Sequence, residues 1–302
     1  MKYCNSVQRH LLCFLIAVAT VFSSSPAWSQ NLHALFKEAA SGGRFAMPTH
    51  KELAEAQLLF ELLLAGKKDT KAFCELLESL HMEMVPVQHE GIRLTVIREN
   101  PDRKRGRGLY VYNADAADSA CLMAPHSFTD VLTGRIALKL VGMGGFTLTA
   151  FNTMKRYGAD GDIKLDQDMA HLTGTYFTAL SHAIAKLTDS PRVIQLHGYG
   201  QEFRSTPEGR EADIVVSSGQ RLLLAAAKQV SDCLSADNSY ITRTYPDEVG
   251  ELGGTTNVTG RIMRKAGQKG FIHVELSRPV RNRLNRELET LQRFNRCLTD
   301  RR

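Results

Sequence analysis

The chain has 302 residues and a formal net charge of +6, and aromatic residues make up only 7% of it. Its basic residues are spread out apart from the run 103–107, and no aromatic residues are interleaved with them, which argues against a nucleic-acid surface. We interpret the basic run as a solvated loop and keep binding of an anionic polymer as the less favoured alternative. The length suits one large domain, with or without a small helical prefix.

The first 29 residues have the features of a signal peptide. Lys2 and Arg9 give a positive start, residues 11–22 are apolar, and Ala27 and Ser29 are small residues at the positions that a signal peptidase reads. The apolar run is too short to favour a membrane span, and no later stretch is long and apolar enough for one. We therefore expect a periplasmic or secreted protein without stable membrane insertion after cleavage; an uncleaved anchor is the alternative.

Four cysteines follow this leader, and their spacing fits no zinc-finger or CxxC pattern. They are Cys74, Cys121, Cys233 and Cys297. In an oxidising compartment an even number indicates one or two disulfides, and the sequence leaves all three full pairings open. Because Cys121 falls in an apolar run, the alternative is that it is simply a core residue.

Residues 30–88 are predicted to form a helical N-terminal segment. Apolar residues recur at helical spacing from Leu53 to Leu63, and Gly66 then provides a stop. Thr70 can cap a second helix. We expect this segment to pack on the main domain, which we assign to residues 89–302.

Strand patterns alternate with helical patterns through the main domain. The expected strands are 92–97, 108–112, 120–125, 147–151, 193–196, 213–217 and 271–276. The expected helices are 130–140, 166–186, 219–234 and 281–297. Such alternation predicts an α/β fold with a mixed, mostly parallel sheet covered by helices on both faces.

Three of the predicted strands end at a residue that can bind a metal or move a proton. His126 follows Pro125, which cannot donate to a sheet ladder and so ends its strand. His197 ends a second strand, and Glu275 lies at the end of the last one. Ligands of open α/β sheets bind at the carboxyl ends of the strands, so we expect these side chains to share one edge.

Asp130 can join His126 at a metal ion, because four residues of helix return to the same face. With His197 they would give three protein ligands and leave a fourth position open, as in catalytic zinc sites. The alternatives are that Asp130 only caps a helix and that His197 is a structural histidine. Gly198 after it would let the chain turn sharply and another group come close.

Glu275 is a candidate general base, because a buried carboxylate in a strand is unusual unless it is paired or functional. Beside an activated water it could take a proton and pass it to a leaving amine. The alternative is a salt bridge with Arg278 or Arg281.

Asn152 and Arg156 are candidates for binding a substrate carboxylate, since arginine can donate two parallel bonds and asparagine can add another. The alternative is a loop asparagine and a surface arginine. Asp168 and His171 lie one helical turn apart; they could support the site, but starting a helix is the favoured interpretation. Arg261 is a weaker candidate for substrate contact.

These motifs resemble the N-formylglutamate amidohydrolase and poly-γ-glutamate hydrolase group, which is related to the zinc carboxypeptidases. The resemblance covers about residues 119–285 and rests on three short motifs in order: Ala124-Pro125-His126-Ser127, Leu196-His197-Gly198 and His273-Val274-Glu275-Leu276. It implies a three-layer α/β/α fold with one zinc, His126 and His197 as ligands, and Glu275 as the general acid/base. It has no counterpart to the helical N-terminal segment.

The resemblance also implies an acidic ligand shortly after the first histidine, which here is Asp130. The zinc carboxypeptidase pattern has glutamate three residues after that histidine, where this chain has Thr129. Asn152 and Arg156 resemble the pair that holds a substrate carboxylate in those enzymes.

We therefore expect an exported zinc-dependent amide hydrolase, amidohydrolase or carboxypeptidase-like, acting on a glutamyl or peptide substrate that bears a carboxylate. One alternative is a metal-free enzyme with Ser127 as nucleophile and His197 as base, although Ser127 lacks the glycine-flanked elbow of such enzymes. The other is an exported, non-catalytic binding protein for an acidic ligand on the same fold. Loops 199–211 and 244–262, which would shape the pocket, have no readable pattern.

Overall fold

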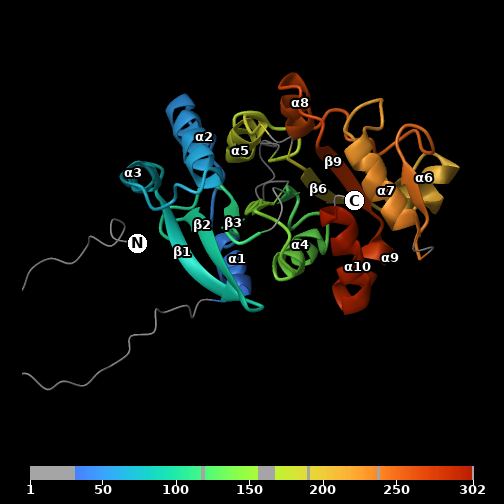
Figure 1. The fold of residues 1–302 in the computed structure, drawn as a ribbon, viewed down its shortest axis with the longest axis horizontal. Helices are drawn as coiled ribbons and strands as arrows, with labels where there is room; N and C mark the ends of the chain where they lie inside the picture. Colours follow the sequence, from blue (N-terminus) through green and yellow to red (C-terminus); the bar gives the residue numbers. More distant parts are fainter. Residues whose placement is uncertain (1–30, 117–119, 156–166, 189–190, 237–238, 301–302) are drawn as a thin grey trace, which may run out of the picture.

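The computed structural model describes residues 31–116, 120–155, 167–188, 191–236 and 239–300 (Figure 1). The predicted signal peptide and Arg156 lie outside these ranges. Among the helices within them, none has both the length and the apolar character needed to cross a bilayer.

The described residues form a nine-stranded mixed sheet in the order β1-β2-β3-β5-β4-β6-β9-β7-β8. Its strands are β1 (Met82–His89), β2 (Ile92–Glu99), β3 (Leu109–Tyr112), β4 (Cys121–Ala124), β5 (Leu148–Phe151), β6 (Val193–Gly198), β7 (Ile214–Ser217), β8 (Thr242–Thr244) and β9 (Phe271–Leu276). Neighbours among β5, β4, β6 and β9 pair in parallel, so the carboxyl ends of these central strands lie at one edge. Strands β1 to β3 extend the sheet in antiparallel fashion, and β7 runs antiparallel to β9.

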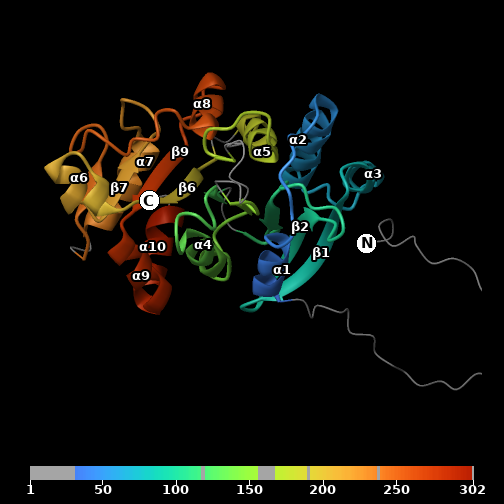
Figure 2. The ribbon, with the colours of Figure 1, turned by 180° about the vertical axis from the view of Figure 1, so that it is seen from behind.

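Helices cover both faces of this sheet, as Figures 1 and 2 show from opposite sides. One face packs against α1 (Leu32–Ala39), α4 (Thr133–Val141), α7 (Ala225–Ala236), α9 (Arg278–Arg286) and α10 (Leu288–Thr299). The other face packs against α2 (His50–Leu64), α3 (Lys71–Ser79), α5 (Tyr176–Ala185) and α8 (Val258–Lys265). Alternate side chains of each strand enter these two cores. The predicted three-layer α/β/α fold is therefore confirmed, with the parallel strands at its centre.

The first strand departs from the prediction, because Met82–His89 is an edge strand and not the end of a helical segment. It pairs with β2 through a two-residue turn at Glu90 and Gly91, whose φ values are 49° and 80°. Left-handed residues at both positions make a turn whose twist matches that of the flanking strands. Pro86 is tolerated because β1 lies at the edge of the sheet.

The predicted helices 130–140 and 219–234 begin later, at Thr133 and Ala225, and the other two depart further from the prediction. In the predicted helix 166–186, the regular helix begins only at Tyr176, behind a capping box between Thr175 and Thr178, and residues 167–175 form turns. The positive φ of Gly174 separates the two parts. The predicted helix 281–297 is divided at Glu287 into α9 and α10, because Glu287 has extended backbone angles. The short elements α6 (Pro207–Glu211), η1 (Gln201–Phe203), α8 and β8 were not predicted.

The basic run 103–107 is not uniformly solvated, which corrects the prediction for Arg107. This side chain is buried and donates to Glu52 of α2 at 3.1 Å. The backbone amides of Arg105 and Arg107 donate to the buried Glu99 carboxylate at 2.5 and 2.9 Å. Buried charges need such partners, and here they fasten α2 to the turn between β2 and β3.

A disulfide joins Cys233 of α7 to Cys297 of α10. Cys121 is a free thiol buried in β4, as the core interpretation predicted. The disulfide fastens the C-terminal helix to the layer that covers one face of the sheet.

Candidate metal centre

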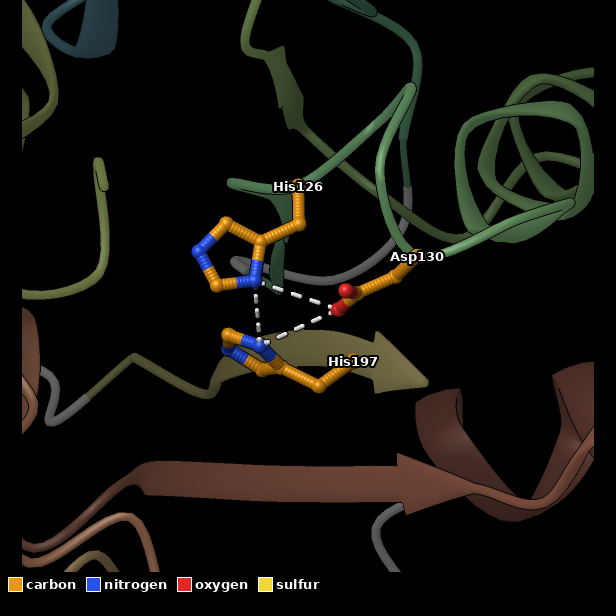
Figure 3. Close-up of side chains that lie close together, drawn as sticks. All are labelled: His126, Asp130 and His197. Carbon is orange, nitrogen blue, oxygen red and sulfur yellow. Dashed lines mark hydrogen bonds and ion pairs between the residues drawn. The ribbon is translucent and has the colours of Figure 1, made fainter. Parts of the chain in front are cut away.

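Two imidazoles and one carboxylate converge at the carboxyl ends of β4 and β6 (Figure 3). His126 Nδ1 lies 3.1 Å from Asp130 Oδ2 and 3.3 Å from His197 Nδ1. The third side of the triangle, from His197 Nδ1 to Asp130 Oδ2, measures 3.6 Å. His126 and His197 are buried, and Asp130 is nearly so.

This triangle has the size of one face of a zinc tetrahedron. Bonds of 2.0–2.1 Å from zinc to nitrogen or oxygen place tetrahedral ligands about 3.3 to 3.5 Å apart. The three distances from 3.1 to 3.6 Å bracket that spacing. The donor set, two neutral imidazoles and a carboxylate, is also the one that catalytic zinc sites use, with a fourth position left open. The residues therefore fit a zinc ion.

The far nitrogens of both imidazoles are held by acceptors. His126 Nε2 lies 2.7 Å from Asp168 Oδ1, and His197 Nε2 lies 3.2 Å from Gln195 Oε1. A histidine that donates from Nε2 presents the lone pair of Nδ1. In the neutral, metal-binding form of each histidine the Nδ1 lone pair then points into the triangle, and such outer partners are typical of metal-binding histidines.

Asp130 is oriented by the backbone on both sides of the site. Its own amide donates to His126 O at 3.0 Å, which closes a helical turn and returns its side chain to His126. Its Oδ2 also accepts from Gly198 N at 3.0 Å. Helix α4 begins after Leu132 without a side-chain cap, so Asp130 does not act as its cap.

Gly198 allows a close approach at this point, as its position after His197 predicted. A Cβ atom there would lie 2.6 Å from the guanidinium of Arg281. Arg281 passes through this gap and donates to Val131 O and to Tyr199 O at 2.7 and 2.9 Å. Arg281 therefore braces the backbone on both sides of the site.

The charges of the site depend on one another. Burial disfavours the charged form of His126, but hydrogen bonds to Asp130 and Asp168 outweigh it and raise the pKa of His126 to about 9. Burial works against both carboxylates, yet their hydrogen bonds to histidines hold the pKa of each well below its ordinary value. Burial lowers the pKa of His197. The two carboxylates thus favour a positive charge in the triangle.

Glu275 lies beside this centre because the register of β6 and β9 sets it opposite His197. Burial first, and then the negative charge of Asp130, raises the pKa of Glu275 to about 8. His273, two residues earlier on the same face, lies opposite Gln195, and its Nε2 is 3.8 Å from Glu275 Oε1. Two pairs of polar residues thus lie side by side on β6 and β9: Gln195 with His273, and His197 with Glu275.

A cleft of about 520 Å³ opens over the site. Its lining includes the three candidate ligands, Glu275, His273 and residues of both loops that had no readable pattern, Arg204 and Thr256 among them. A larger hollow of about 780 Å³ contains none of the candidate site residues. The candidate ligands and Glu275 therefore lie at the smaller cleft.

Three other candidates, Asn152, Ser127 and Arg261, are not among the residues that line the cleft. The Asn152 amide donates to Pro125 O and Met154 O and accepts from Met154 N, so all of its groups but one lone pair are used. Ser127 Oγ donates to Ala124 O, and Arg261 is exposed on α8. Asn152 therefore shapes the turn behind His126 instead of facing the cleft, and Ser127 has no contact with His197.

Sequence reasoning underrated Asp168 and missed Gln195, His273 and Arg204. Asp168 supports the site from a turn: its Oδ2 lies 3.0 Å from His171 Nδ1, while its Oδ1 accepts from Ala170 N and His126. Gln195 and His273 could have been found from the alternation of side chains along a strand, since each lies two residues before a predicted site residue and so on the same face. No such signal marks Arg204.

Comparisons with known proteins give weak likenesses. No family model matches the chain, and a search of curated proteins finds no match either. Among solved structures, a variant of the cell shape determinant protein Csd4 from Helicobacter pylori is 15% identical with a TM-score of 0.39, covering 60% of this chain and 51% of its own. An aspartoacylase family protein from Mesorhizobium loti is 13% identical with a TM-score of 0.35, covering 72% of this chain and 66% of its own.

The chain thus spans about half the length of the Csd4 chain. At these values neither likeness bears on the chemistry of the site. The resemblance to N-formylglutamate amidohydrolases remains a prediction from the sequence motifs.

Proposed function

We propose that this protein is a zinc-dependent hydrolase of amide bonds. The observation that carries the proposal is the convergence of His126 Nδ1, His197 Nδ1 and Asp130 Oδ2 in a triangle with edges of 3.1 to 3.6 Å. Outer acceptors occupy both Nε2 atoms, so each neutral imidazole offers its Nδ1 lone pair at the centre, where a bound cation replaces the proton that His126 otherwise holds. The cleft above leaves room for water and a substrate carbonyl.

Glu275 is the group that moves the proton. When bound, zinc supplies a Lewis acid that polarises the amide carbonyl and acidifies water. The Glu275 carboxylate takes the proton from water as it attacks the carbonyl carbon, and then gives it to the nitrogen of the leaving amine. A pKa raised by burial suits both halves of this transfer, because the carboxyl group must accept and then release a proton near neutral pH.

In this proposal Arg204 binds the substrate carboxylate, the role that the sequence motifs suggested for Asn152 and Arg156. It lies in the wall of the cleft, its side chain is 23% exposed, and its buried Nε finds no hydrogen-bond partner among the described residues. Its NH1 makes only a long contact of 3.5 Å to Glu251. A guanidinium with spare donors is suited to a carboxylate. The proposed substrate is accordingly a glutamyl or peptide amide with a carboxylate near the cleaved bond.

The disulfide supports the accompanying proposal that the protein works outside the cytoplasm, in the periplasm or secreted. Disulfides persist in oxidising compartments and are rare in reducing ones. The Cys233–Cys297 bond is of the structural kind, since it joins two helices that contribute no residue to the lining of the cleft.

Metal content and its link to turnover test the function directly. Purified protein should contain one zinc ion per chain, and chelation should remove both the zinc and the hydrolysis of acyl-glutamate or short peptide probes, with zinc restoring both. His197→Ala should abolish zinc binding, whereas Leu222→Ala, at a surface position 61% exposed, should leave it unchanged. A metal-free protein with both histidines intact would refute the proposal. Zinc binding without turnover on any probe would instead favour a binding protein.

A further inference from the structure

Gln195 lies buried beneath the metal centre on β6, and its amide meets two different kinds of partner. Its Oε1 faces His197 Nε2 at 3.2 Å and Asn257 Nδ2 at 2.6 Å. Its Nε2 donates to Thr259 Oγ1 at 2.9 Å. Gln195, Asn257 and Thr259 are all buried, so water does not substitute for a missing partner. The orientation of this amide therefore decides whether His197 meets an acceptor or a donor.

Asn257 fixes the amide from one side. It is the N-cap of α8, and its Oδ1 accepts from the backbone amide of Gly260 at 3.2 Å. A backbone N–H can only donate, so the oxygen of Asn257 must face Gly260 and its nitrogen must face Gln195. The atom that Gln195 presents to Asn257 is therefore the oxygen.

Thr259 and Ser181 fix the same amide from the other side. Ser181 Oγ of α5 donates to Phe177 O at 2.8 Å, and a carbonyl can only accept. Having one hydrogen, Ser181 must then accept in its 3.0 Å bond with Thr259, so the Thr259 hydroxyl donates to it. Thr259 Oγ1 accepts in turn from Gln195, which must present its nitrogen. Backbone groups at both ends thus impose one orientation on Gln195.

We propose that Gln195, held by Asn257 and Thr259, fixes His197 in the tautomer with hydrogen on Nε2. The oxygen of Gln195 requires a donor from His197, so the lone pair of Nδ1 is presented to the metal before any ion arrives. These three are positioning residues, and their role rests on the metal centre of the proposed function. By preparing the tautomer they remove a cost from metal binding, and outer partners of this kind change metal affinity about 10- to 100-fold.

Asn257→Asp tests this arrangement with little change to the helix cap. One carboxylate oxygen still accepts from Gly260, but the other now meets Gln195 Oε1, and two acceptors at 2.6 Å repel. Gln195 should flip, present its nitrogen to His197 and shift the hydrogen of His197 to Nδ1. Asn31→Asp is the matched control, because Asn31 caps α1 in the same way and is not among the residues that line the cleft.

Two readouts separate this role from a merely structural one. In metal-free protein with labelled histidine, ring nitrogen shifts should show His197 protonated on Nε2 in the wild type and Asn31→Asp, and on Nδ1 in Asn257→Asp. Zinc dissociation constants, from competition with a chromophoric chelator, should rise at least about tenfold in Asn257→Asp only. If Asn257→Asp does not fold, Gln195→Met removes the acceptor at similar volume and should raise the constant by a similar factor.

An unchanged His197 tautomer in both variants, with zinc affinity equal to that of Asn31→Asp, would overturn the proposal. The tautomer is measured without metal, so its outcome does not depend on whether the protein hydrolyses amides. A wild type that binds no zinc would defeat the proposed function, while the tautomer comparison would still decide the role of Gln195.

Discussion

Two regions of this protein bury charge, and they do so in opposite ways. Where α1 and α2 meet the antiparallel strands, Arg98 donates to Glu38 and Glu83, both at 2.7 Å, and Arg107 donates to Glu52 at 3.1 Å. Every one of these contacts joins a donor to an acceptor. This cluster, which we call the N-terminal ion pairs, is complete without any ligand.

At the edge of the central strands the contacts do not balance in this way. In their neutral forms His126 and His197 turn Nδ1 toward Asp130 Oδ2, while their Nε2 atoms face Asp168 and Gln195. Without an ion, a proton on His126 offsets the two carboxylates. Buried charge alone therefore does not identify a functional site. Metal-ligating atoms that converge on one point do, and the two regions should respond differently to mutation.

The largest expected effect belongs to Glu275→Gln. The amide cannot accept the proton from water, so turnover should fall by about 10²- to 10⁴-fold. Zinc content should not change, since Glu275 is not one of the three ligands. Steady-state kinetics with zinc analysis on the same sample measures both, and Glu208→Gln, exposed on α6, is the control. Unchanged turnover would exclude Glu275 as the base.

Arg107→Met should damage the N-terminal ion pairs and spare the metal centre. Removing one partner of a buried pair costs about 3 kcal/mol, because the other charge and the polar groups around it remain. Urea unfolding should show this loss, while the zinc affinity of the folded protein should match that of the wild type. Arg105→Met, an exposed change in the same loop, should alter stability by less than about 0.5 kcal/mol. A parallel loss of zinc affinity would show that the two regions are coupled.

Asp168→Asn should weaken the metal centre and leave the N-terminal ion pairs intact. The amide oxygen can still accept from His126 Nε2 but lacks the negative charge that makes the ligand more basic. We expect zinc affinity to fall about tenfold, measured by chelator competition. Asp232→Asn, in an exposed pair with Lys228, is the control. Equal affinity in both variants would limit Asp168 to shaping its turn.

The smallest effect concerns Glu61 of α2 and Lys186, which lie 2.6 Å apart at the surface. Burial opposes ionisation of Glu61, but hydrogen bonds from Lys186 and Gln57 outweigh it and lower its pKa. A lowered pKa in the folded state contributes stability above the unfolded value near 4.3, and this stability is lost as pH falls through the folded value.

In Lys186→Gln the free energy of unfolding should therefore fall less steeply between about pH 5 and 3 than in the wild type. The difference should be less than about 1 kcal/mol, because the pair is exposed. Urea unfolding at several pH values measures this slope. Lys51→Gln, which breaks a longer ion pair of 3.7 Å on the same helix, should change the slope less. A slope equal to that of the wild type in both variants would mean that Lys186 does not lower the Glu61 pKa.

The central strands and their polar ends could be predicted because the information is local. Pro125 and Gly198 mark the ends of two apolar runs, and parallel pairing then brings His126 and His197 to one edge. Asp168 belongs to a stretch with a helical pattern that tertiary contacts hold as a turn. Asn257 caps α8 and meets Gln195 on β6, a partner distant in the sequence. Contacts of this kind connect distant segments, and no short pattern records them.

The Glu251 carboxylate, one residue before the cleft-lining Leu252, holds two loops together. Glu251 accepts from the backbone amides of Ser205 and Thr206 and from the Thr206 hydroxyl, and so joins loop 199–211 to loop 244–262. A protein engineer who grafts either loop alone from another protein would leave this carboxylate or those amides without a hydrogen-bond partner. To change which substrates the cleft admits, both loops would have to be exchanged together, as one module.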